Sequence, residues 1–303
     1  MAFALLFSGQ GTQHPDMLPW LAEDAQVRNM RARLGVDDWR RCLEDQAWAA
    51  RNANAQQLLT GLALAAWGQL ATSVGTPGAV AGYSVGELAA YSAAGVFDAG
   101  TALALASHRA RAMDLSAGAA AGGMLAVNGL TEPALERLLA DTGVAVAIRN
   151  GIESVVLGGP VAALEEAERA AFGQGAHCTR LRVNVASHTP WMREAADSFA
   201  RTLAGVPFQR PRIALYSNAA DRIRGAGAAR TALALQLACT VRWDECMDNV
   251  HARHVRCVLE VGPGQALARM WNQRYPDVPA RACDDFRSAD AVATWVHAHT
   301  GRP

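Results

Sequence analysis

The stretch that decides the fold is Gly78-Ala79-Val80-Ala81-Gly82-Tyr83-Ser84-Val85-Gly86-Glu87, in which a G-x-S-x-G motif joins an apolar run to an alanine-rich one. The apolar run predicts a short buried strand and residues 88–94 predict a helix, so Ser84 would lie on a sharp strand-to-helix turn. Gly82 and Gly86 lack the Cβ atoms that would clash in so tight a bend. The start of the helix would point backbone amides and the positive end of its dipole at an anion beside the hydroxyl. Ser84 is therefore the first candidate for a covalent catalyst, and the alternative is a glycine-rich turn that holds a serine by chance.

Strand-like and helical runs alternate on both sides of this elbow. Residues 2–7 predict a strand, and residues 56–73 and 98–117 predict helices. The alternation indicates an α/β fold, with a large hydrolase-like domain built on a mostly parallel sheet. The run of small residues 116–123 interrupts the pattern and predicts a hinge or a domain boundary.

The next segment has a different rhythm, in the order β-α-β-β-α-β. Its predicted elements are strand 124–127, helix 132–140, strands 144–149 and 154–157, helix 162–172 and strand 178–183. This order is typical of a ferredoxin-like fold. Afterwards we expect helix 190–204, strand 212–217, helices 229–239 and 242–251, strand 255–261 and helix 265–273. The sequence therefore predicts a discontinuous large domain, 1–120 and 188–303, with a small ferredoxin-like domain, 121–187, inserted in it.

The composition excludes several classes of function. Basic and acidic residues balance at 28 each, which argues against nucleic acid or an anionic membrane as the main partner. The basic residues are all arginine, which excludes Schiff-base and lysine general-base chemistry. The six cysteines form no C-x-x-C pair, so we expect neither a zinc site nor a disulfide framework. No apolar run reaches membrane-spanning length and the first residues read as a strand rather than a signal peptide, so we expect a cytoplasmic protein.

A serine hydroxyl needs a base within hydrogen-bond reach, and His188 is the best placed of the eight histidines. It follows a predicted strand and precedes Thr189 and Pro190, which suit the N-cap and first position of a helix. His14 and His108 are weaker rivals. A structural or solvated role for His188 is the alternative.

Arg109 is the candidate for binding an anionic substrate. Its helical neighbours Leu105, Ala106 and Met113 are apolar, which predicts that Arg109 faces inward. A guanidinium is rarely buried without an anionic partner. That partner is either a carboxylate of the protein or a carboxylate of the substrate, and the sequence leaves both open.

Five motifs follow one another along the chain: Gly9-Gln10-Gly11, Gly82-Tyr83-Ser84-Val85-Gly86-Glu87, Arg109, Ser187-His188 and Glu260-Val261-Gly262-Pro263-Gly264. Together they resemble the malonyl-CoA:acyl-carrier-protein transacylase family, and the resemblance covers nearly the whole chain. The inserted segment, with Asn150-Gly151 before Val155-Val156-Leu157-Gly158-Gly159, is also similar to the small domain of that family.

The resemblance implies a role for each motif. Ser84 is the nucleophile, His188 its base and Arg109 the partner of the malonyl carboxylate. The backbone amides of Gln10 and Val85 form the oxyanion hole, which suits the amide after a nucleophile and a glycine bend. In this family a backbone carbonyl rather than an aspartate orients the histidine, and by its place in the chain we expect it near Arg253.

One departure from the family concerns the residue before the nucleophile, which is usually histidine and here is Tyr83. The Gly-Tyr-Ser-Val-Gly-Glu form is most similar to the epsilon subunit of bacterial malonate decarboxylase, a malonyl transacylase that charges the carrier subunit of its own complex. The partners implied are that carrier protein and the other decarboxylase subunits.

The reaction implied is a ping-pong transfer of malonyl from malonyl-CoA to Ser84 and then to a phosphopantetheine-type thiol on an acyl carrier protein. No bound cofactor and no metal are expected. One alternative is a serine hydrolase or thioesterase, although such enzymes usually have an acidic residue between serine and histidine in chain order, and most carboxylates there fall in the inserted domain. Another is a noncatalytic assembly subunit, against which the presence of Ser84, His188 and Arg109 argues.

Overall fold

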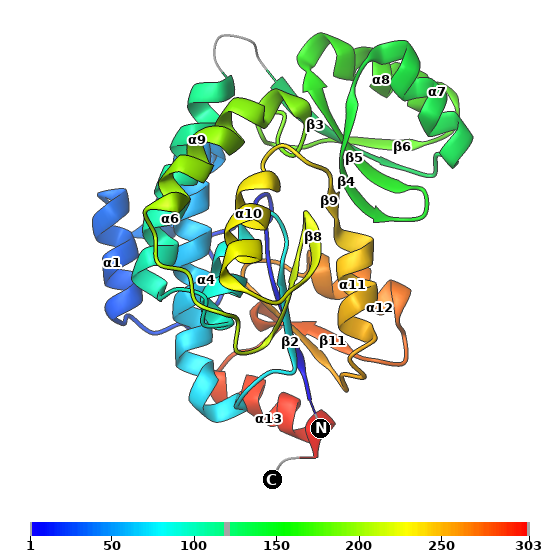
Figure 1. Ribbon diagram of the computed structural model, residues 1–303. Helices are drawn as coiled ribbons and strands as arrows, with labels where there is room; N and C mark the ends of the chain where they lie inside the picture. Colours follow the sequence, from blue (N-terminus) through cyan, green and yellow to red (C-terminus); the bar gives the residue numbers. More distant parts are fainter. Residues whose placement is uncertain (1, 118–121, 302–303) are drawn as a thin grey trace.

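The computed structural model describes residues 2–117 and 122–301 (Figure 1). Residues 118–121, part of the predicted hinge run, lie outside the described residues. The described residues contain no helix that is long and apolar enough to cross a membrane. The chain folds around two sheets, and the cleft between them positions the functional site.

The larger sheet has six strands and is mostly parallel, as predicted. Its order is β11 (Ala280–Ala282), β10 (Val258–Val261), β1 (Ala4–Phe7), β2 (Ala79–Gly82), β7 (Ala214–Ser217) and β8 (Ala220–Ile223). All neighbours are parallel except β7 and β8. Because β1, β2 and β10 run the same way, the segments that follow them meet at one edge of the sheet.

Helices cover both faces of this sheet because side chains alternate along each strand. Phe3, Leu5 and Phe7 lie in a buried cluster that includes residues of seven helices of eight or more residues. These are α1 (Ala25–Leu34), α4 (Asn52–Val74), α5 (Gly86–Ala93), α6 (Ala99–Ala117), α9 (Arg193–Ala204), α10 (Ala226–Leu235) and α13 (Ala289–Thr300). Ala4 and Leu6 lie in a second cluster with α11 (Trp243–His251) and α12 (Ala266–Arg274). Figure 1 shows these two groups of helices on opposite sides of the sheet.

The smaller sheet has the ferredoxin-like order. Its strands are β6 (His177–Arg180), β3 (Gly122–Asn128), β5 (Ser154–Pro160) and β4 (Ala145–Gly151), with β9 (Val241–Arg242) added in parallel beside β4. Helices α7 (Glu132–Thr142) and α8 (Val161–Gly173) pack on one face. Met124, Ile148 and Val156 on the other face join the cluster that contains α11 and α12, so this face turns toward the larger sheet.

Several elements differ from the prediction. The last strand of the small sheet ends at Arg180 rather than Val183, and a 3-10 turn (Pro190–Met192) precedes α9. The sequence did not predict helices α1 and α13 or the short helices α2 (Trp39–Cys42) and α3 (Gln46–Ala50). It also did not predict the 3-10 turn Cys283–Asp285 or strands β8, β9 and β11. The fold class, α/β with an inserted ferredoxin-like unit, agrees with the prediction.

Candidate active site

The G-x-S-x-G motif forms the predicted turn between β2 and α5. Ser84 has a φ of 55°, in the left-handed region that a non-glycine residue rarely adopts. A Cβ on Gly82 would overlap the backbone of Gly86, and a Cβ on Gly86 would overlap the carbonyl of Phe7. Both glycines are therefore required for the turn to pack against the end of β1.

Asn218, which follows β7, holds this strained turn. The Ser84 amide donates to Asn218 Oδ1 at 2.8 Å, and Asn218 Nδ2 donates to the Gly82 carbonyl at 2.7 Å. The Asn218 amide in turn donates to Glu87 Oε1 at 2.6 Å. Asn218 and Glu87 are fully buried, and burial raises the pKa of the Glu87 carboxyl to about 7. The network stabilises a backbone conformation that costs about 1 to 3 kcal/mol.

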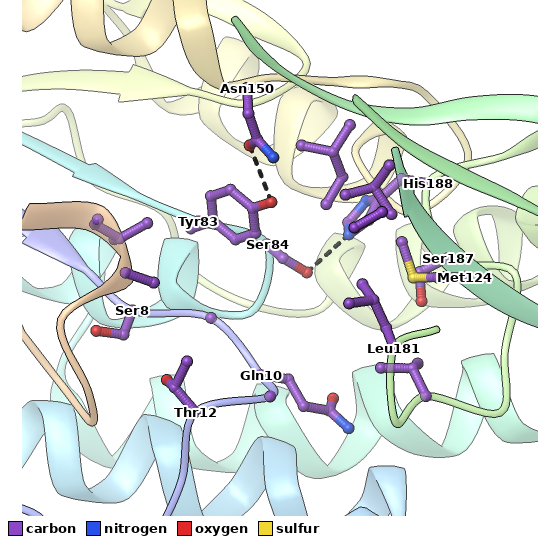
Figure 2. A pocket seen from close by; sticks show the side chains of 18 of the residues that line it. Ser8, Gln10, Thr12, Tyr83, Ser84, Met124, Asn150, Leu181, Ser187 and His188 are labelled. Carbon is purple, nitrogen blue, oxygen red and sulfur yellow. Dashed lines mark hydrogen bonds between the residues drawn. The ribbon is translucent and has the colours of Figure 1, made fainter. Parts of the chain in front are cut away.

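His188 lies within hydrogen-bond distance of the serine. Ser84 Oγ and His188 Nε2 are 2.7 Å apart (Figure 2). His188 Nδ1 lies 2.5 Å from the Gln236 carbonyl oxygen. A carbonyl only accepts, so Nδ1 carries the proton and Nε2 is free to accept the serine proton. The rival histidines do not form this contact, since His14 pairs with Asp284.

The expectation that the orienting carbonyl lies near Arg253 is wrong. The carbonyl belongs to Gln236, and the His188 amide donates to the next carbonyl, that of Leu237, at 2.9 Å. Both residues follow the last turn of α10, where helix carbonyls have no partner within the helix. Burial, and next the charge of Arg109, lower the pKa of His188 to about 3. The imidazole is therefore neutral at pH 7, as a general base must be.

Arg109 faces inward from α6, and its side chain is buried beside the serine. Its Nη2 lies 3.3 Å from both Ser84 Oγ and Gln236 Oε1. No carboxylate of the described residues forms an ion pair with it, and its Nε has no hydrogen-bond partner among them. Burial lowers the pKa of Arg109 to about 10, although Glu87 opposes this. Arg109 therefore stays charged at pH 7 and retains a free donor.

A cavity of about 260 Å³ opens above Ser84 and His188. The loop after β1, residues 8–12, forms one side of it, together with Ala266, Leu267 and Met270 of α12. Figure 2 shows Ser8, Gln10 and Thr12 of this loop on one side and Met124, Leu181 and Ser187 on the other. The opposite wall is mostly apolar and consists of Met124, Ala126, Ile148, Val156, Leu181 and Val183.

Two backbone amides lie at the site, that of Val85 directly after Ser84 in the chain and that of Gln10 on the loop that lines the cavity. Within residues 2–117 and 122–301, no hydrogen bond is formed by the amide of Val85, which follows the nucleophile, or by the amide of Gln10. The Ser84 amide is occupied by Asn218. Unpaired amides next to a nucleophile are suited to an oxyanion, which gains strong hydrogen bonds from them.

Comparison with known proteins identifies the family. The family model described as the acyl transferase domain matches residues 42–302. The chain belongs to the acyl transferase domain family. This acyl transferase is 32% identical to the malonyl CoA-acyl carrier protein transacylase of Mycobacterium tuberculosis, over 96% of this chain and 99% of the relative.

Solved structures agree with this assignment. An acyl-carrier-protein S-malonyltransferase from Burkholderia pseudomallei superposes with a TM-score of 0.88 at 30% identity, over 97% of the acyl transferase and 100% of that chain. A malonyl-transacylase solved in complex with its type II PKS acyl-carrier protein gives 0.89 at 28% identity, over 97% and 99% of the two chains. The predictions of fold class and of an acyltransferase are confirmed.

The site of this acyl transferase contains groups that the sequence reading missed. The structure brings Ser84, His188 and Arg109 together and adds Asn218 and the Gln236 side chain, which the sequence analysis did not include. Asn218 follows a predicted strand of a parallel sheet, a position where site residues gather, so a signal for it existed. The described residues contain no group of three or more His, Cys, Asp and Glu placed to hold a metal.

Tyr83 links the elbow to the smaller sheet. Its hydroxyl donates to Asn150 Oδ1 on β4 at 3.1 Å, as Figure 2 shows, and its ring packs edge-on against Trp243 with centroids 5.2 Å apart. Burial raises the pKa of the phenol, which therefore stays protonated. Tyr83 thus forms part of the cavity wall rather than contacting Ser84 Oγ.

Proposed function

We propose that this protein is a malonyl-CoA:acyl-carrier-protein malonyltransferase that works by a ping-pong mechanism through an ester on Ser84. The observation that carries the proposal is the position of Arg109, which is buried and lies 3.3 Å from Ser84 Oγ. Arg109 forms no ion pair with a carboxylate of residues 2–117 and 122–301. A buried guanidinium matches a carboxylate bidentately, and a malonyl thioester has a free carboxylate close to its reacting carbon. The relatives with malonyl in their names support the same substrate.

The first half of the reaction would acylate Ser84. His188 Nε2 takes the hydroxyl proton while Ser84 Oγ attacks the thioester carbon, and the amides of Gln10 and Val85 receive the charge that forms on the carbonyl oxygen. The carbon–sulfur bond then breaks, and the proton on His188 passes to the departing CoA sulfur. The products are a malonyl ester on Ser84 and free CoA thiol.

The second half would reverse these steps with a different thiol. His188 takes the proton from a carrier thiol and the sulfur attacks the ester carbon. The bond between that carbon and Ser84 Oγ then breaks, the proton on His188 passes to Oγ, and the malonyl group leaves as a thioester of the carrier. The acceptor is a phosphopantetheine-type thiol on an acyl carrier protein, which the relative solved with its carrier supports. No bound cofactor is needed for either half.

The proposal extends to the acceptor carrier protein, the domain boundaries and the location of the protein in the cell. The Gly82–Glu87 form supports the carrier subunit of malonate decarboxylase as acceptor and the other decarboxylase subunits as neighbours. The two sheets support a division into 1–120 with 188–303 and 121–187. All six cysteines are free, which supports a cytoplasmic location.

The test is to incubate the protein with radiolabelled malonyl-CoA and then with candidate carriers. We expect a stable radioactive label on the wild type and none on Ser84→Ala. The labelled malonyl group should pass to a carrier, and the rate of this transfer should fall when His188 is replaced. Equal labelling of wild type and Ser84→Ala would refute the ester. Release of free malonate faster than transfer to every carrier tested would instead identify a thioesterase.

A further inference from the structure

The loop that carries Gln10 is fixed at its first residue by a buried carboxylate. Ser8 Oγ donates to Glu260 Oε1 at 2.9 Å, and Glu260 Oε2 accepts from the Ala268 amide at 2.8 Å. Ser8 and Glu260 are both buried, at 5% and 0% exposure, and both line the cavity. The carboxylate lies on β10, directly beside β1 in the sheet.

The turn after β10 contacts both ends of the same loop. Thr12 Oγ1 donates to the Pro263 carbonyl at 2.8 Å. A Cβ on Gly262, whose φ is 140°, would lie 2.7 Å from the Ser8 Cβ, and a Cβ on Gly264 would lie 2.8 Å from the Thr12 Cβ. The turn therefore needs glycine at both positions in order to reach the loop.

The apex of the loop has a third contact. A Cβ on Gly9 would lie 2.8 Å from Cδ1 of Tyr83, so the loop packs directly on the residue before the nucleophile. Gln10, the next residue, is thereby held between the elbow and the turn after β10. The contacts at the two ends and at the apex of the loop restrict the movement of the Gln10 amide relative to Ser84.

We propose that Glu260 is a positioning residue that, through Ser8, aims the Gln10 amide at the oxygen that becomes negative when Ser84 attacks. Glu260 does not reach the reacting atoms itself. An apolar side chain at this position would fill the space without the cost of burying a carboxylate, but it would give Ser8 no acceptor. This inference rests on the proposed acylation of Ser84, because the Gln10 amide matters only if an oxyanion forms.

Two variants separate positioning from general stability. Ser8→Ala removes the contact that fixes the loop. Glu260→Gln can keep both contacts, because its oxygen can accept from the Ala268 amide while its NH₂ group donates to a Ser8 hydroxyl that has rotated to accept. Ser288→Ala is the matched control, since it removes the N-cap contact to Ala291 at the remote helix α13 and lowers stability by a comparable route.

The measurement is the single-turnover rate of Ser84 acylation by malonyl-CoA, with kcat and KM in the steady state. We expect Ser8→Ala to lower the acylation rate and kcat by about 10- to 100-fold, as a misplacement of up to about 1 Å does, with KM changed less than about twofold. Glu260→Gln should recover to within about threefold of the wild type, and Ser288→Ala should have the wild-type rate. If Ser8→Ala does not fold, Thr12→Val at the other end of the loop replaces it with the same expected loss.

A fluorophosphonate probe distinguishes this inference from the function on which it rests. The probe phosphonylates an activated serine and places an oxygen in the same hole, whichever acyl group the enzyme uses. A wild type that reacts with the probe but not with malonyl-CoA would refute the malonyl proposal, and the positioning role would then be read from the probe rates. A folded Ser8→Ala with wild-type acylation rates would overturn the positioning role. A Ser8→Ala variant with a raised KM and an unchanged kcat would overturn it too, and so would a Glu260→Gln variant whose acylation rate falls as far as that of Ser8→Ala.

Discussion

Replacing Arg109 by methionine tests how the protein tolerates a buried charge. Methionine is unbranched and uncharged, so it replaces the aliphatic stem of Arg109 but not the guanidinium that contacts Ser84 and Gln236. Burial lowers the pKa of Arg109 well below its usual value, to about 10, which corresponds to about 3 kcal/mol against the charged form in the folded protein. Loss of the contact to Gln236 Oε1 leaves that buried oxygen unpaired and costs about 1 to 3 kcal/mol.

The two effects oppose each other, so the free energy of unfolding of Arg109→Met should lie between no change and a gain of about 2 kcal/mol. Activity should respond in the opposite sense. Truncating one partner of a buried charge pair costs about 2 to 5 kcal/mol, so the preference for malonyl-CoA over acetyl-CoA should fall at least about 30-fold. If the partner of Arg109 is the substrate, its replacement should give an enzyme that is more stable and less selective.

The assays are urea unfolding at pH 7 and acylation rates with malonyl-CoA and acetyl-CoA. Arg111→Met, on the same helix but exposed, is the control and should change neither quantity appreciably. A loss of more than about 3 kcal/mol in unfolding free energy would show that the protein itself stabilises the Arg109 charge. An unchanged malonyl preference would show that Arg109 does not bind the substrate carboxylate.

Three further changes test the surroundings of the serine. A carboxyl whose pKa is raised to about 7 contributes stability below about pH 4.5 and loses that contribution as the pH rises through 7. The free energy of unfolding of Glu87→Gln, measured in urea, should therefore exceed that of the wild type by about 2 kcal/mol more at pH 8 than at pH 5. An equal difference at the two pH values would contradict this. Asn218→Ala should lose about 2 to 4 kcal/mol of stability and slow acylation, since its side chain holds the Ser84 amide; unchanged acylation would show that the elbow holds itself. Tyr83→Phe should keep kcat within about threefold, because the hydroxyl faces Asn150 and not Ser84, and a hundredfold loss in steady-state assays would contradict that placement.

The parts of the fold that the sequence predicted are those whose signals are local. The apolar run before the elbow and the β-α-β-β-α-β order each lie within a continuous stretch. Helix α1 also had local signals that were overlooked, since Asp24 caps its first turn and Gly35 ends it with a φ of 66°. Strand β9 had none, because its two residues are a strand only through pairing with β4, about ninety positions earlier in the chain.

The residues of the site likewise fall into those marked by local sequence and those brought together only by the tertiary structure. Ser84 and Arg109 can be predicted as candidates from their neighbours in the chain, since a motif surrounds one and apolar helical positions surround the other. The carbonyl that orients His188 was misplaced because its position depends on where α10 ends in space. Gln236 is 48 residues from His188, and nothing in the sequence around either one encodes the contact. Backbone groups carry no side-chain identity, so sequence patterns cannot mark them.

What distinguishes the site physically is that two unfavourable features coincide there. Ser84 and His188 both have positive φ, but so do Leu18, Glu153 and His254, so strained backbone alone does not mark function. Ser84 differs from the other three because it also contacts Arg109, a buried charge that forms no ion pair with a carboxylate of the described residues. His188 differs because it is itself a buried imidazole whose pKa is far below its usual value. A fold selected for stability alone would remove either feature at small cost, and retaining both within one hydrogen-bond network is explained by a substrate that supplies the missing anion.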